Sequence, residues 1–68
     1  DLDKALGYYK MAYEKNPSDI YNIFAYARAL DLNKHYTQAI QYYKKALPKA
    51  KNKKMFDDIS HRVSQLEG

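Results

Sequence analysis

The strongest constraint on the fold of this chain is a pattern of five residues that recurs after 34 positions. Alanines flank a Tyr-Tyr-Lys run in both copies: Ala5, Tyr8, Tyr9, Lys10 and Ala12, then Ala39, Tyr42, Tyr43, Lys44 and Ala46. A fixed period of this length is typical of proteins built from repeated supersecondary units. The apolar residues around both copies share the same offsets and would lie on one helical face. The sequence therefore predicts two copies of one amphipathic helix.

Turn and cap signals divide the chain into four helices, which we expect over residues 2–15, 20–32, 36–47 and 55–66. Pro17 and Pro48 mark two of the breaks, because proline cannot continue a helix that precedes it. Short polar side chains can accept hydrogen bonds from the free N–H groups of a helix start. The candidate caps are Asp1 or Asp3, Ser18 or Asp19, and Thr37. The short connections indicate antiparallel neighbours.

The four helices differ in how much of their surface is apolar. Residues 20–32 are apolar nearly all round, so this helix needs cover on more than one side. The helix over residues 55–66 has one narrow stripe, made of Phe56, Ile59, Val63 and Leu66. A helix that needs cover on one side only suits the end of a stack. We expect Tyr9 and Tyr43 to point inward, and Tyr8 and Tyr42 to lie at the flank.

Composition limits the class of protein. Sixty-eight residues make one small domain, and the absence of cysteine excludes a disulfide scaffold. No apolar run approaches the ~20 residues that span a membrane. The start at Asp1 without methionine suggests a piece of a longer protein, and the compartment stays open. His35 and His61 lack further ligands at helical spacing, and no residues form a catalytic constellation, so we expect no enzyme, metal or cofactor.

The residues resemble the tetratricopeptide repeat family, whose second helix places a small, an aromatic and a small residue before a proline in the turn. Ala5, Tyr9, Ala12 and Pro17 follow this pattern, and Ala39, Tyr43 and Ala46 follow it again without the proline. The resemblance implies an all-α fold of antiparallel helix-turn-helix repeats, stacked as a right-handed α-solenoid. Residues 1–19 would be the second helix of a partial repeat, 20–53 a full repeat and 54–68 a capping helix.

The resemblance implies a scaffold or adaptor that binds a peptide or a partner helix in a concave groove. The groove-facing residues would be Tyr21, Phe24, Arg28 and Asp31, which share one face of the helix over residues 20–32. Phe24 flanked by Arg28 would suit an apolar side chain next to a carboxylate. In the alternative interpretation, Tyr21 and Phe24 simply pack against the last helix or another chain.

Two further surfaces give alternative functions. The uncovered first helix could bury its apolar face against another copy, which would make the chain a structural or self-associating segment. Residues 44–54 are rich in lysine, with Lys44, Lys45, Lys49, Lys51, Lys53 and Lys54, and the formal net charge is +4. This segment could bind an acidic protein, nucleic acid or anionic lipid. We favour the alternative, a solvated face that complements the helix dipole, and do not expect nucleic-acid binding, because aromatic residues do not interleave with the lysines as in a single-strand binder.

Overall fold

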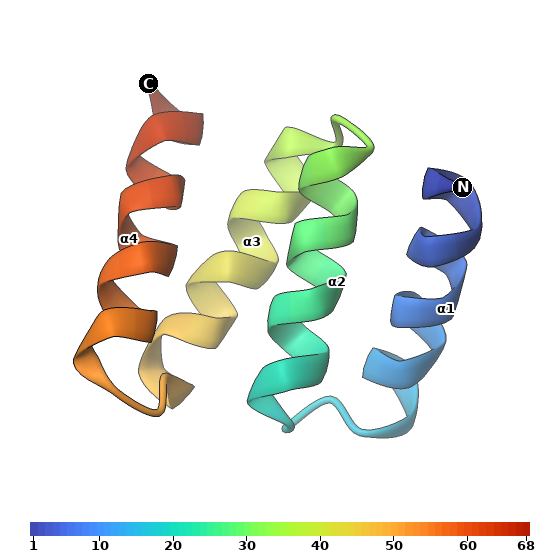
Figure 1. The fold of residues 1–68 in the computed structure, drawn as a ribbon, viewed down its shortest axis with the longest axis horizontal. Helices are drawn as coiled ribbons and strands as arrows, with labels where there is room; N and C mark the ends of the chain where they lie inside the picture. The colour runs from blue at the N-terminus through green and yellow to red at the C-terminus, as the bar shows by residue number, and fades with distance from the viewer.

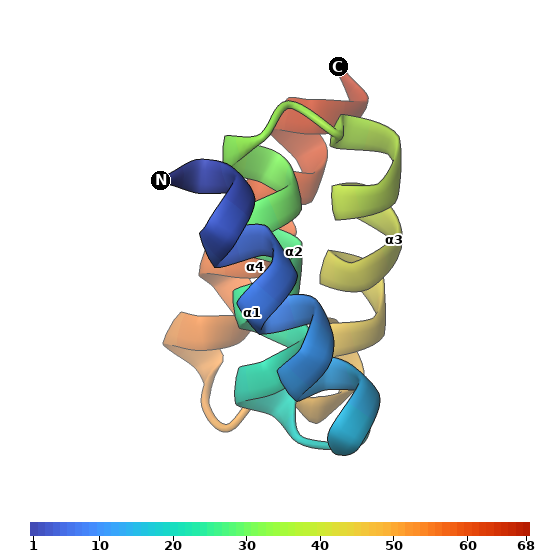
Figure 2. The ribbon, with the colours of Figure 1, turned by 90° about the vertical axis from the view of Figure 1, so that its right-hand side faces the viewer.

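The computed structural model describes residues 1–68 as four α-helices and one short 3-10 helix. The elements are α1 (Leu2–Lys15), α2 (Ile20–Leu32), α3 (Tyr36–Ala46), η1 (Leu47–Lys49) and α4 (Lys53–Glu67). Neighbouring helices pack antiparallel, α1 on α2, α2 on α3 and α3 on α4 (Figure 1). The termini therefore lie at opposite ends of the long axis, on α1 and α4. Figure 2 shows α3 set to one side of α2 and α4.

Side chains at the N-termini explain where three of the helices begin. Asp1 accepts hydrogen bonds from the N–H groups of Asp3, at 2.8 Å, and Lys4, at 3.3 Å, and so caps α1. Asp19 caps α2 by accepting from the Tyr21 N–H at 2.8 Å. Asn52 caps α4 by accepting from the Met55 N–H, also at 2.8 Å. These bonds satisfy N–H groups that have no partner inside the helix.

α3 begins at Tyr36 as predicted, but its cap, its end and the start of α4 differ from the sequence prediction. Thr37 is not a cap: His35 takes that position, and α3 begins without a side-chain hydrogen bond. The α-helix ends at Ala46, and Pro48 lies in the first turn of η1, where its missing N–H is not needed. Asn52 then starts α4 at Lys53, two residues before the predicted position, because its side chain supplies a cap.

A tight turn joins α2 to α3. The His35 N–H donates to the Leu30 carbonyl and the Lys34 N–H donates to the Asp31 carbonyl, both at 2.9 Å. This pair of bonds is the Schellman arrangement, which places one residue in the left-handed backbone region. Lys34 is that residue, with a φ of 65°. The turn reverses the chain within three residues and sets α3 antiparallel to α2.

The core forms around α2, which contributes more than half of the buried residues. The clustered core residues are Ile20, Ile23, Tyr26, Ala27, Leu30, Ala39, Tyr43, Ala46, Ile59 and Val63. α1 buries none of its residues fully, although Leu6 and Tyr13 pack against the core. On α4, Ile59 and Val63 are buried as predicted, but Phe56 is 45% exposed and Met55 packs against the core instead.

The two copies of the repeated pattern have different surroundings. Tyr43 is 1% exposed, because α2 and α4 both cover it. Tyr9, its counterpart in the first copy, is 37% exposed, since only α2 lies beside it and the cavity between the two helices is open. The prediction that Tyr9 points inward is therefore only partly correct. Tyr42 packs instead with Tyr13 of α1 and Tyr26 of α2, with ring centroids 5.1 and 4.7 Å away.

None of the helices has both the length and the apolar character needed to span a membrane.

Candidate functional site

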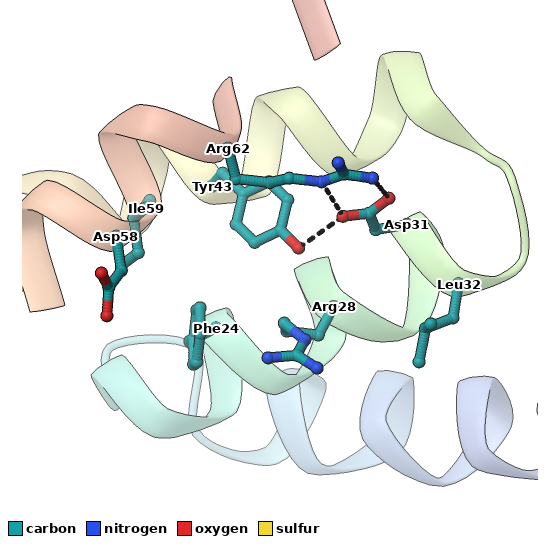
Figure 3. Close-up of a pocket in the computed structure, with 8 residues that line it drawn as sticks. All are labelled: Phe24, Arg28, Asp31, Leu32, Tyr43, Asp58, Ile59 and Arg62. Atoms are coloured by element: carbon teal, nitrogen blue, oxygen red, sulfur yellow. Dashed lines mark hydrogen bonds and ion pairs between the residues drawn. The ribbon is translucent and has the colours of Figure 1, made fainter. Parts of the chain in front are cut away.

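The candidate site is a cavity of about 440 Å³ between α2 and α4, with α3 behind it. Its lining contains three of the four residues that the sequence predicted to face a groove: Phe24, Arg28 and Asp31. The remaining lining residues are Leu32, Tyr43, Asp58, Ile59 and Arg62. Figure 3 shows Phe24, Arg28 and Asp31 following one another along α2, with Arg62 and Asp58 facing them from α4.

Tyr21 does not belong to this cavity. It lies in the first turn of α2 with 60% of its surface exposed. Together with Lys49 and Lys51 it lines a separate hollow at the end of the molecule where the α1–α2 connection meets η1. Helical spacing places Tyr21 on the same side of α2 as Phe24, but the wall formed by Asp58, Ile59 and Arg62 does not extend that far.

The polar end of the cavity is an ion pair reinforced by a phenol. Arg62 donates from Nε and Nη2 to the two carboxylate oxygens of Asp31, both at 2.7 Å. The Tyr43 hydroxyl donates to Asp31 Oδ2 at 2.8 Å, so the carboxylate joins α2, α3 and α4 (Figure 3). Two parallel bonds from one guanidinium are the strong, directed form of this interaction. Asp31 is thus an anchor for α4 rather than a free ligand-binding group.

Each member of this anchor changes the proton affinity of the others. The hydrogen bond from Arg62 lowers the pKa of the Asp31 carboxyl, and the bond from Tyr43 adds to this effect against the opposing effect of burial. Burial raises the pKa of the Tyr43 phenol, as does its bond to the Asp31 carboxylate. Asp31 likewise raises the pKa of Arg62. At neutral pH the anchor therefore holds an ionised acid, a charged guanidinium and a neutral phenol.

Sequence reasoning missed Arg62, although the sequence contains a signal for it. Asp31 is the only acidic residue on α2, a helix that is otherwise mostly apolar. A carboxylate in such surroundings requires a cation or several N–H groups. The nearly apolar character of α2 could therefore have directed attention to a cation on a neighbouring helix.

Arg28 differs from the other charged residues of the cavity, because no carboxylate pairs with it. Its guanidinium lies 5.9 Å from the centre of the Phe24 ring, within the range of a cation–π contact. The Asp31 charge is balanced by Arg62, and Asp58 pairs with Lys54 at 2.9 Å. The open part of the cavity therefore presents one exposed positive charge next to an aromatic ring.

Comparisons of the chain with protein-family models, with curated proteins and with solved structures found no match. Membership of the tetratricopeptide repeat family is thus not shown, and neither is a solenoid. The chain is a small all-α domain of four antiparallel helices.

The lysine-rich segment does not form a single field of free charge. Lys44 pairs with Glu67 at 2.6 Å, Lys53 with Asp57 at 2.8 Å and Lys54 with Asp58 at 2.9 Å. Lys45 lies 5.0 Å from the centre of the Tyr42 ring and also faces Tyr13. Of the six lysines predicted as a basic patch, Lys49 and Lys51 alone lack an ion pair or an aromatic partner.

Proposed function

We propose that this domain is a protein–protein interaction module that holds a peptide or a partner helix on the open face of α2. The observation that carries the proposal is the cavity beside Phe24 and Arg28, whose volume of about 440 Å³ lies in the usual range for binding sites. An aromatic ring and an unpaired arginine in one hollow are the residue types that most often anchor protein partners.

The arrangement of the helices supports a repeat-type module like the tetratricopeptide repeat. α1 begins at Leu2 and α3 begins at Tyr36, 34 positions later, in agreement with the period of the repeated pattern. Each helix contacts mainly its neighbours along the chain, as in stacked repeats. In such an arrangement α2 and α4 would be equivalent helices with a groove between them, which is where the cavity lies.

The proposal is tested by capture of a partner from the native source with crosslinking. We compare the wild-type chain with a Phe24→Ala/Arg28→Glu double variant, after circular dichroism has established that the variant is folded. A partner held through this face should be captured at least about tenfold less well by the variant, which corresponds to about 1.4 kcal/mol. Undiminished capture by the folded variant would contradict the proposal.

The second candidate function is self-association or stacking through α1, favoured by the exposure of large apolar residues on that helix. Leu2, Tyr8 and Met11 are each more than half exposed, and α1 packs mainly on α2, with Tyr13 alone reaching Tyr42 and Lys45 of α3. A Lys4→Glu/Tyr8→Ala variant makes comparable changes on α1, the loss of one aromatic ring and the reversal of one positive charge, also four residues apart. Loss of capture with this variant and not with Phe24→Ala/Arg28→Glu would favour the second function.

A further inference from the structure

A second cavity opens on the other side of α2, between α1 and α2. Its volume is about 280 Å³, and seven of the nine residues that line it are hydrophobic. The lining residues are Leu2, Ala5, Tyr9, Phe24, Ala25, Arg28, Ala29, Leu32 and Asn33. Sites for whole small molecules usually begin near ~300 Å³, so this cavity suits a single side chain.

The two cavities share one wall. Phe24, Arg28 and Leu32 line both, four residues apart along α2, so they form a ridge with a hollow on each side. A ligand that lies across this ridge would occupy both hollows at once. Leu2 and Leu32, at the rim of the second cavity, are 52% and 56% exposed, which leaves apolar surface for such a ligand to cover.

Arg28 is the one charged residue of the second cavity, and its guanidinium N–H groups are free to donate hydrogen bonds. The other polar residue, Asn33, already donates its side-chain amide to the Leu2 carbonyl at 3.2 Å and the Ala29 carbonyl at 2.8 Å. On the α4 side of the ridge, Asp31, Arg62 and Asp58 are paired with one another or with Lys54. Charge complementarity along the whole groove therefore calls for a single carboxylate at Arg28.

We propose that the α1–α2 cavity is the subsite for an apolar side chain of the partner, and that Arg28 binds a carboxylate next to that side chain. The occupant is thus a segment of a partner protein in which an acidic residue, or a terminal carboxylate, accompanies a large apolar residue. This inference rests on the proposed function and adds the place and the chemistry of the anchoring residue.

Phenylbutyrate is a minimal probe of this subsite, since it joins one aromatic ring to one carboxylate. We titrate it into the ¹⁵N-labelled 68-residue chain and follow amide chemical shifts, with phenylbutanol as the uncharged match. We expect the acid to shift Ala5, Tyr9 and Arg28 and to bind more tightly than the alcohol. Arg28→Gln should weaken the acid roughly threefold to tenfold and leave the alcohol unchanged, since a single charge-assisted contact is lost.

Several outcomes would overturn the subsite without touching the proposed function. Shifts confined to Asp58 and Ile59 would place the ring in the α2–α4 cavity, and equal binding of acid and alcohol would exclude a role for Arg28. No shifts at millimolar probe would mean that the cavity takes no side chain. Shifts at Ala5 and Tyr9 that follow protein concentration alone would identify a second copy as the occupant. By contrast, the subsite is supported if an Ala5→Phe variant, whose new side chain fills the cavity, no longer responds to phenylbutyrate.

Discussion

At the scale of single residues, the position of α4 depends on Asp31. Its two carboxylate oxygens receive three hydrogen bonds, two from Arg62 on α4 and one from Tyr43 on α3. The side chain of Asp31 is 11% exposed, so the loss of its partners would leave a charge with little access to water. The anchor therefore fixes one wall of the α2–α4 cavity relative to Phe24 and Arg28.

Replacement of Asp31 by asparagine should make the stability of the domain lower at pH 7 and less dependent on pH in acid. The pKa of Asp31 is lower in the folded chain than in the unfolded chain, so the unfolded chain binds this proton first as the pH falls. The stabilisation from Asp31 is therefore present above about pH 4 and is lost as the pH falls through the folded-state pKa. Urea unfolding of wild type and Asp31→Asn from pH 7 to pH 2 measures this difference.

Asp58→Asn is the matched control, because it changes another carboxylate of the same cavity. Asp58 forms an exposed pair with Lys54 four residues away, an interaction that contributes about 0.5 kcal/mol or less. We expect little change at pH 7. If Asp31→Asn and the wild type had the same free energy of unfolding at every pH, the anchor would not stabilise the fold.

At the scale of elements, sequence patterns predict helices well where a cap residue and a turn residue agree. Asp1 and Asp19 start α1 and α2, and Asn16 and Asn33 end them, at the positions predicted. α3 also starts at Tyr36 as predicted, but through the backbone turn at Lys34 and without the predicted cap at Thr37. Asn52 caps α4, but it lies between lysines, and the sequence prediction did not identify it as a helix start.

Alanine substitutions test the cap at Asn52. The comparison is Thr37, which the sequence predicted as the cap of α3. Asn52→Ala should destabilise the domain by about 1 kcal/mol, because the Met55 N–H loses its partner. Thr37→Ala should leave stability unchanged or raise it by a few tenths of a kcal/mol, since alanine forms helices better than threonine. Thermal unfolding followed by circular dichroism gives both values. A destabilising Thr37→Ala and a neutral Asn52→Ala would show that Thr37, and not Asn52, is the capping residue.

At the scale of the whole molecule, the candidate site was predictable in part. Helical spacing placed Phe24, Arg28 and Asp31 on one face of α2, and in the structure these three residues line one cavity. The extent of the cavity depends on where α4 lies, and the sequence gives no distance between helices. This is why Tyr21 was included, why Arg62 was missed, and why the ion pairs that divide the lysine-rich segment could not be foreseen.

In the proposed function, a partner covers the face of α2 between α1 and α4. The chain has no cysteine, so single-cysteine variants report on one position each. We would measure the rate of thiol modification in Leu32→Cys, Tyr21→Cys and Tyr8→Cys variants, alone and with a partner captured by the wild-type chain. All three positions are more than half exposed in the structure. We expect the partner to slow modification at position 32 alone; protection at position 8 with none at position 32 would contradict the proposed binding face.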